Sequence, residues 1–439
     1  MNQVIVIGAG LAGSEASWQM ANRGIEVTLY EMKPRLFSPA HKSENFAELV
    51  CSNSLRSDQE NSAVGLLKKE MLLLDSLIMQ AAHATKIPAG KALAVNRDLF
   101  SAFITEKILT HPNIKVIREE VKTIDPEELT IIASGPLCSD ALTKQISTFI
   151  GSTHLYFYDA ISPIISADSI DFTKTFWADR WEPDKETPDY LNIPLNKEKY
   201  VAFVDEIINA EKVPTKNFEK EIHFEGCLPI EELARRGLMT LAFGPFKPVG
   251  LLSPNSLEKP FAVIQLRKEN HLGTAFNLVG CQTKLTYAEQ KRIFRTLPGL
   301  ENAEFERLGS MHRNTYINSP DCLSKHGFLS ANPNIFFTGQ ITGVEGYIES
   351  AASGLITGLI ISSYMKTGSY LNIPNTKTAL GALYAKLQTR EKTYTPSNIT
   401  FSMFSPLELD KKFSKLGRKA LYTERAKQEL KLWKDSLII

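Results

Sequence analysis

The sequence is poor in cysteine, and its few cysteines are not arranged to bind a metal or to crosslink the chain. The five cysteines among 439 residues are Cys51, Cys138, Cys227, Cys281 and Cys322, with no C-x-x-C pair. An odd, scattered set argues against a disulfide framework and against a tetrahedral zinc site. The eight histidines form no pair at helical ligand spacing, so we expect no metal.

Several other signatures are missing. No apolar run is expected to cross a membrane, and no basic segment precedes an apolar stretch at the N-terminus, which together favour a cytoplasmic protein with no membrane association. The net charge of +1 gives no overall field that attracts a polyanion. The absence of G-x-S-x-G, P-loop and H-E-x-x-H motifs argues against serine hydrolases, P-loop kinases and zinc proteases.

The first 31 residues predict a βαβ unit that binds a dinucleotide. A strand at 4–7 leads through a glycine-rich turn into a helix over 14–22, and a second strand covers 26–30. The turn reads Gly8, Ala9, Gly10, Leu11, Ala12 and Gly13. Its glycines allow a tight turn, close approach to the pyrophosphate and close packing of helix on strand, while Glu31 can accept from ribose hydroxyls.

A second glycine-rich turn favours FAD over NAD, because the first fingerprint alone serves both cofactors. A strand over 335–337 passes through Gly339, Gln340, Gly343 and Gly346 into a helix of small residues over 349–361. Flavoproteins place such a turn beside the flavin and the pyrophosphate. A plain helix start is the alternative interpretation of this segment.

The order of elements predicts an α/β protein with two domains. Helical patterns cover 65–83 and 97–110, and the buried strand that begins at 130 belongs in the middle of the sheet. Segments at 261–266 and 274–279 predict an antiparallel hairpin. We therefore expect a discontinuous, Rossmann-like FAD-binding domain of the glutathione-reductase type over 1–159 and 325–439, with an inserted, largely antiparallel α+β domain over 160–324.

Two cysteines have a setting that suits chemistry. Cys227 precedes Pro229, Glu231 and Glu232, which fit the first turn of a helix, and a helix N-terminus lowers the pKa of a thiol. Cys51 lies in a polar loop with Arg56, whose charge could lower the pKa of the thiol in the same way. An inert, buried thiol remains the alternative for both residues.

Basic residues gather in the last 29 residues and on the predicted insertion. Residues 411–439 hold nine lysines and arginines and three acidic residues, so their net charge is 9 − 3 = +6. Such a patch attracts phosphate backbones, although a solvated helix face is the alternative for each residue alone. Our candidates for RNA contacts are Lys247, Arg267, Arg292, Lys412 and Arg418.

Five sequence blocks resemble one family, the FAD- and folate-dependent tRNA (uracil-5-)-methyltransferases (TrmFO), which are related to the MnmG tRNA-modifying flavoproteins. The blocks are the first glycine turn with Ser14 and Glu15, and residues 49–56, 224–229, 241–251 and 339–347. The similarity runs nearly end to end. The chain lacks the long C-terminal helical extension expected of MnmG.

The resemblance implies a reaction and its participants. In this family 5,10-methylenetetrahydrofolate gives a one-carbon unit to reduced FAD, the flavin passes it to uracil C5 in the tRNA T-loop, and NAD(P)H supplies electrons. Cys227 matches the thiol that adds to uracil C6, since C5 is a poor nucleophile until such an addition. Cys51 matches the second active-site cysteine, which either removes the C5 proton or captures the methylene group.

Three other interpretations stay open. The same chemistry can act on ribosomal RNA uracil, the protein can be a small-molecule flavin oxidoreductase, or it can bind RNA and keep FAD only for folding. Only one full dinucleotide fingerprint is present, so NAD(P)H is expected to visit the flavin without a Rossmann domain of its own. We expect a monomer or a weak homo-oligomer.

Overall fold

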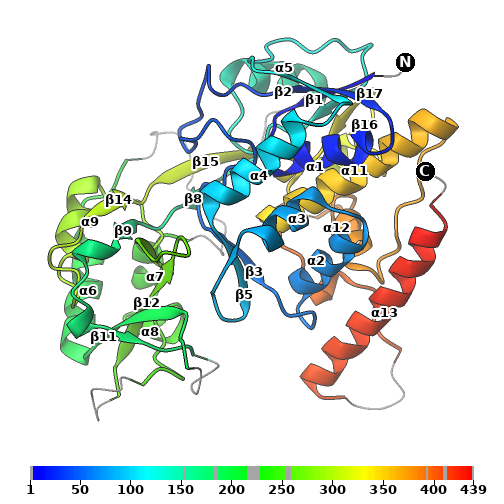
Figure 1. Ribbon diagram of the computed structural model, residues 1–439. Coiled ribbons are helices and arrows are strands. Elements are labelled where there is room, and N and C mark those ends of the chain that lie inside the picture. The colour runs from blue at the N-terminus through cyan, green and yellow to red at the C-terminus, as the bar shows by residue number, and fades with distance from the viewer. Residues whose placement is uncertain are drawn as a thin grey trace.

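The computed structural model has two lobes joined by a pair of strands (Figure 1). The residues it describes are 3–151, 155–180, 186–214, 228–252, 259–391, 394–408 and 413–437. One lobe is built on a mostly parallel sheet and carries both ends of the chain, and the other is built on an antiparallel sheet from the middle of the chain. The predicted fold class is therefore confirmed.

A six-stranded sheet in the order β16-β17-β7-β1-β2-β6 forms the centre of the first lobe. Its strands are β1 (Gln3–Ile7), β2 (Glu26–Tyr30), β6 (Ile114–Ile117), β7 (Thr130–Ile132), β16 (Phe328–Leu329) and β17 (Asn332–Phe337). The strand β7 pairs in parallel with β1 on one side and β17 on the other, which confirms its predicted central position. Residues far apart in sequence thus share one sheet, so this lobe is discontinuous.

Two helices that follow the two glycine turns pack closely against each other. They are α1 (Leu11–Ala21) and α11 (Tyr347–Thr367). A Cβ on Gly358 would lie 2.9 Å from the oxygen of Ala16, so this close approach requires glycine. We expected no apolar run of membrane-spanning length, but α11 reaches it by length and composition; 89% of its most apolar stretch is buried in the protein.

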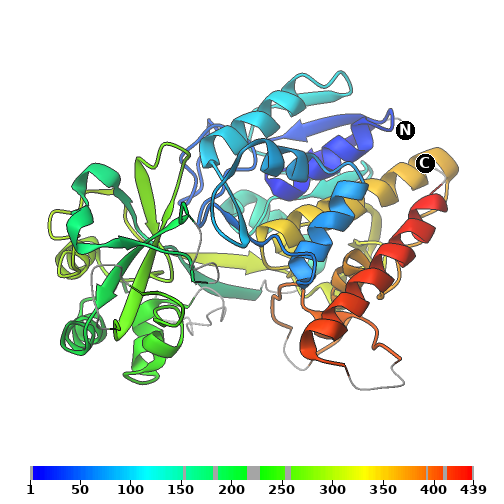
Figure 2. The same cartoon turned by 60° about the horizontal axis from the view of Figure 1, so that its bottom comes forward.

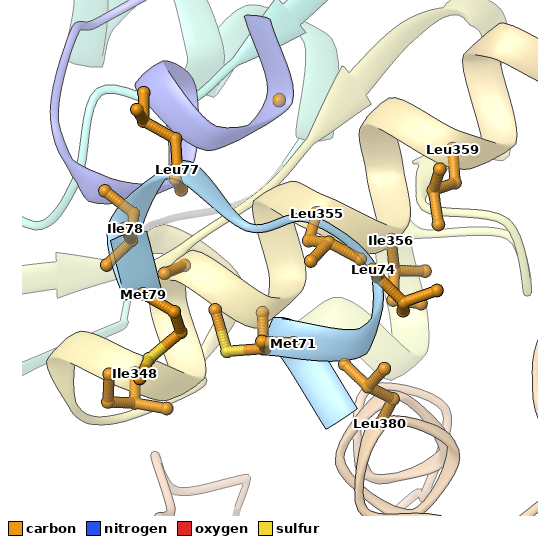
Figure 3. Packing of buried hydrophobic residues seen from close by; sticks show 14 of the residues in the cluster. Met71, Leu74, Leu77, Ile78, Met79, Ile348, Leu355, Ile356, Leu359 and Leu380 are labelled. Atoms are coloured by element: carbon orange, nitrogen blue, oxygen red, sulfur yellow. The ribbon is translucent and has the colours of Figure 1, made fainter. Parts of the chain in front are cut away.

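The predicted helix over 65–83 is two helices, α2 (Ala63–Leu73) and α3 (Leu77–Ala84). The chain reverses at Asp75, whose φ is 59°, and the hydroxyl of Ser76 accepts from the amide of Met79 to start the second helix. Serine is a preferred N-cap, so this break has a local cause. Figure 3 shows Met71 and Leu74 in one apolar cluster with Leu355 of α11.

The rest of the first lobe consists of short elements around this core. They are β3 (Ser54–Ser57), β4 (Lys86–Ile87), β5 (Ala92–Val95), α4 (Arg97–Leu109), α5 (Asp140–Ile150), α10 (Ser319–Cys322) and α12 (Ala379–Lys386). The strands β3, β5 and β4 form a separate small sheet. Its strand β3 follows Cys51 in the sequence, and the sheet extends towards the inserted lobe (Figure 1).

The inserted lobe is a six-stranded antiparallel sheet in the order β10-β11-β12-β13-β9-β14. Its strands are β9 (Ile164–Ser166), β10 (Phe176–Trp177), β11 (Tyr190–Leu195), β12 (Ala262–Lys268), β13 (Ala275–Leu278) and β14 (Phe305–Arg307), and its helices are α6 (Lys197–Asn209), α7 (Ile230–Arg235), α8 (Thr240–Phe243) and α9 (Tyr287–Phe294). The pairing of β12 with β13 confirms the predicted hairpin. A separate apolar core lies between this sheet and its helices.

The strands β8 (Leu155–Ala160) and β15 (Met311–Tyr316) pair antiparallel and connect the lobes. They lie close to the predicted domain boundaries at 159/160 and 324/325, which themselves stay a prediction. The last helix, α13 (Lys415–Asp435), runs along the first lobe beside α2 (Figure 2). It is the predicted basic helix, and Lys427 and Glu429 tie it to the first lobe through Glu60 and Lys377 at 2.6 and 2.7 Å.

Candidate active site

The first glycine turn shapes one wall of a groove along the carboxyl edge of the parallel sheet. Gly8 has a φ of +102°, and a Cβ there would lie 2.7 Å from the oxygen of Ala133, so the turn requires glycine. A Cβ on Gly10 would meet nothing within 4 Å, which leaves the backbone open on the groove side. The helix α1 begins here without a side-chain cap, as a helix that receives a phosphate does.

Glu31 is held at one end of this groove by two backbone amides. The amide of Ala9 donates to one carboxylate oxygen at 2.9 Å, and the amide of Lys33 donates to the other at 3.0 Å. Each oxygen keeps a lone pair for a further donor. The carboxylate therefore has a fixed position and free lone pairs, while its predicted contact with ribose hydroxyls stays a prediction.

The second glycine turn meets the first across the groove. Gly339 has a φ of +80°, and a Cβ there would lie 2.7 Å from the Cβ of Ala12. Of the predicted cofactor residues, those that line the groove are Gly8, Ala9, Gly10, Leu11, Ala12, Glu31, Gly339 and Gln340. Gly13 instead packs against the turn itself, Gly343 against the ring of Tyr394, and Gly346 lines a second cavity. The open glycine backbone, the uncapped helix and the fixed carboxylate fit a dinucleotide such as FAD.

The second cavity, of about 440 Å³, continues from the groove and lies between the two lobes. The two hollows share Val50, Pro136, Leu137, Gln340 and Tyr347 in their walls. The groove and the cavity are therefore adjacent, and these residues line both.

Cys51 lies in the wall of this cavity and is paired with a tyrosine. Its sulfur is 2.9 Å from the hydroxyl oxygen of Tyr347, and that hydroxyl also accepts from the Cys51 amide at 2.8 Å. Burial raises the pKa of the Cys51 thiol to about 11, with Asp159 adding to the rise, while Tyr347 and Arg97 oppose it. At neutral pH this thiol therefore holds its proton.

The cation expected beside Cys51 is a different arginine from the one predicted. Arg56 forms an ion pair with Glu349 at 2.6 Å, so the Glu349 carboxylate neutralises its charge. Arg97 contributes the charge that lowers the pKa of Cys51, and its side chain donates to Glu269 at 2.7 Å. The prediction that Arg56 tunes Cys51 is wrong, because the chain turns Arg56 towards the start of α11.

Carboxyl and imidazole groups complete the cavity wall. Burial and the neighbouring Asp159 raise the pKa of Glu345 well above its usual range, and Gln340 donates to this carboxyl at 2.7 Å. Burial and Arg307 lower the pKa of His312 to about 4, so its ring is neutral. Sequence reasoning gave no role to these residues, although Glu345 and Tyr347 lie inside the block 339–347, which carries part of the family resemblance.

The predicted RNA contacts fall in different places. Arg267 is 7% exposed and lines the cavity, so its prediction as a surface phosphate contact is wrong. Its guanidinium donates to Asn53 and Ser52, each at 2.8 Å, which explains its burial. Arg292 is exposed and pairs with Glu206 at 2.6 Å.

Two of the other predicted RNA contacts lie in the described part of the chain, whereas the third and Cys227 do not. Lys247 is half-buried and Arg418 is exposed on α13. Cys227 and Lys412 lie outside the described residues. Pro229 is the N-cap of α7, with Glu231 and Glu232 in its first turn as predicted. Within the described part of the chain, no three His, Cys, Asp or Glu residues gather as metal ligands would.

The fold and the groove define a Rossmann-type flavoprotein with an inserted antiparallel lobe. A family model described as glucose inhibited division protein A matches residues 3–369. The structure of Aquifex aeolicus GidA in its form II crystal has the same fold, with a TM-score of 0.70 and 15% identity over 99% of this chain and 73% of that chain.

Sequence relatives place the chain in a narrower family. A protein of Oleidesulfovibrio alaskensis named methylenetetrahydrofolate–tRNA-(uracil-5-)-methyltransferase TrmFO is 53% identical over 438 residues, 99% of this chain and 97% of that protein. A protein of Geobacter sulfurreducens with the same name is 54% identical over 98% of each chain. The chain belongs to the TrmFO family, as the resemblance found in its sequence blocks implied, and it is an enzyme of that family.

Proposed function

We propose that the protein uses FAD to methylate C5 of uracil in the tRNA T-loop, with the carbon from 5,10-methylenetetrahydrofolate and electrons from NAD(P)H. The observation that carries this proposal is the shared wall: the dinucleotide groove and the cavity of Cys51 meet at Gln340 and Tyr347. When bound, the flavin and the folate supply the one-carbon unit and its electrons. The names of the relatives at 53–54% identity support the folate donor and the tRNA acceptor.

The residues of the chain supply proton handling and orientation. We assign to Cys51 the removal of the C5 proton by its thiolate; because the thiol is protonated at neutral pH, its own proton must first leave through the hydrogen bond to Tyr347. Tyr347 is placed to pass this proton on, since its hydroxyl lies 2.9 Å from the sulfur. Cys227 keeps the role that the family resemblance gives it, addition to uracil C6.

The site also restricts access of water to the reacting atoms. Most of the cavity wall comes from residues of the two lobes that are buried or half-buried, such as Ile161, Asn277 and Ile348. Few bulk waters can surround reacting groups in such a cavity, and this strengthens the electrostatic interactions among them.

The test is a reconstituted methylation assay. The purified protein is incubated with NADPH, methylenetetrahydrofolate and unmodified transcripts of tRNA or ribosomal RNA, and 5-methyluridine is then mapped. We expect product in the T-loop of tRNA, strongly reduced in Cys51→Ala and retained in the matched variant Cys322→Ala. Product only in ribosomal RNA, or NADPH oxidation with no product in either RNA, would contradict the proposal.

A further inference from the structure

One polar side chain in the cavity has a donor that the described protein does not use. Asn277 lies in β13 between Phe276 and Leu278, which are 1% and 0% exposed, and is itself 3% exposed. Its Nδ2 has no hydrogen-bond partner among the described residues. A buried amide without a hydrogen-bond partner is costly and uncommon in native proteins. The unpaired Nδ2 of Asn277 therefore indicates that a bound ligand accepts its hydrogen bond.

The strand pairing directs Asn277 towards the loop of Cys51. Asn277 stands opposite Arg267 in the antiparallel pair of β13 and β12. Side chains of opposite residues point to the same face of a sheet. Arg267 reaches Ser52 at 2.8 Å, so this face meets the loop next to Cys51, and Asn277 lines the same cavity.

A carboxamide matches one edge of uracil. The amide of an asparagine carries a donor beside an acceptor, and uracil presents a carbonyl oxygen at C4 beside an N–H at N3. Cytosine presents the reverse pattern, an amino donor beside an acceptor nitrogen. The site would therefore accept uracil, and it would reject cytosine where Nδ2 rather than Oδ1 faces the C4 substituent, because a carboxamide turned over presents the reverse pattern.

We propose that Asn277 is the residue that recognises the target uracil, by donating from Nδ2 to the C4 carbonyl oxygen. This inference rests on the proposed function. Negative charge develops on the C4 oxygen when a thiol adds to C6, so a donor fixed there also stabilises the adduct. Asn277 thereby determines specificity and supports the reaction with one hydrogen bond.

Folate offers the same lactam chemistry, because its pterin ring also has a carbonyl next to an N–H. We favour uracil because Asn277 lies on the strand that faces the Cys51 loop, where the base must react. Folate recognition is one outcome of the test, which measures binding of tetrahydrofolate separately from binding of RNA.

The experiment compares tRNA transcripts that differ at the target base. One transcript carries uridine there, and the other carries 2-pyrimidinone ribonucleoside, which lacks both the C4 oxygen and the N3 proton. The wild-type holoenzyme should bind the second about tenfold more weakly, the value of one good hydrogen bond. In Asn277→Ala the ratio of the two Kd values should fall to about one, while exposed Asn209→Ala should keep the wild-type ratio.

A second variant keeps the size of the side chain at position 277 and changes only its hydrogen-bonding groups. Asn277→Asp replaces the donor by an acceptor and should shift binding from uridine towards cytidine at the target position. The flavin absorbance and the Tm of each variant report that the fold is intact.

Two results would overturn the inference: a Kd ratio unchanged in Asn277→Ala, or a loss of tetrahydrofolate binding with the RNA ratio unchanged. Failure of the proposed function gives a different result, since the wild-type protein would then form no 5-methyluridine in tRNA. Failure of this inference leaves wild-type methylation intact.

Discussion

Arg267 of the inserted lobe donates a hydrogen bond from Nε to Oδ1 of Asn53, in the Cys51 loop of the Rossmann lobe, at 2.8 Å. Asn53 returns the contact by donating to the backbone oxygen of Lys268 at 3.0 Å. The loop that carries the thiol is thus fixed by a strand of the other lobe. The position of Cys51 therefore depends on how the two lobes meet.

Replacement of Arg267 should lower turnover without loss of the flavin. Arg267→Lys keeps the charge but cannot hold Ser52 and Asn53 together, because lysine lacks the planar fork. We expect kcat to fall about tenfold to 100-fold, since a small misplacement of a reacting group has that effect. Steady-state methylation and the flavin spectrum are the measurements, and a tRNA Kd that weakens while kcat stays constant would support a surface role instead.

The buried ion pair between Arg97 and Glu269 should couple the lobes. Their side chains are 15% and 8% exposed and 2.7 Å apart. Arg97→Met leaves Glu269 without its partner in the interface, and we expect a loss of about 3–5 kcal/mol in the free energy of unfolding. The double variant Arg97→Met with Glu269→Leu should recover part of this loss in urea titrations; additive losses would show that the pair is not coupled.

The reactivity of Cys51 should rise only at high pH. Burial disfavours its thiolate and raises its pKa to about 11, so about one thiol in a thousand is ionised at pH 8. The rate of alkylation by iodoacetamide, followed by peptide mass spectrometry, should increase tenfold per pH unit up to about pH 11. Arg97→Met should shift this profile to still higher pH. A plateau below pH 9 in the wild-type protein would contradict the described environment.

The first glycine turn offers a matched pair of substitutions. Gly8 and Gly24 both have positive φ values, +102° and +79°, so alanine strains the backbone at either position by about 1–2 kcal/mol. Only Gly8 lines the groove, and only there would the Cβ meet Ala133. Gly8→Ala should lose FAD, seen as a lower absorbance at the flavin band per protein, whereas Gly24→Ala should stay yellow.

The basic helix α13 should contribute to tRNA binding through its exposed residues. Lys427 forms an ion pair with Glu60, and Arg425 donates a hydrogen bond to the backbone oxygen of Pro406, whereas Arg418 is exposed. Arg418→Glu should weaken tRNA binding and reduce its dependence on salt, with the flavin spectrum unchanged. Lys144→Glu on α5 is the charge-matched control. Equal effects of both variants would indicate a general effect of net charge.

Local patterns predicted the elements whose cause is local. The strand at 26–30 has the predicted bounds, because alternation and Gly24 define it within a few residues. The glycines of the first turn, with their spacing, predicted the groove and Glu31 at its end. The break at Asp75 was missed because apolar periodicity continues across it.

Contacts between distant segments were beyond local patterns. Arg56 and Glu349 pair across 293 positions, and the burial of Arg267 depends on a loop 214 residues away. A sequence shows that an arginine is present, but its exposure depends on which carboxylate or amide the fold brings to it. For the same reason the sequence shows Asn277 only as a polar residue in a predicted strand. Its position in the cavity wall, which the structure shows, is the basis for the role we propose.

The central claim is that the groove and the cavity of Cys51 form one site that moves carbon to uracil. Its most direct test supplies methylenetetrahydrofolate labelled with ¹⁴C in the methylene group, together with NADPH and unmodified tRNA, and counts label in isolated nucleosides. We predict label in 5-methyluridine with the wild-type protein and almost none with Cys51→Ala, although that variant keeps its FAD. Equal labelling by both proteins, or label that never reaches uridine, would contradict the account.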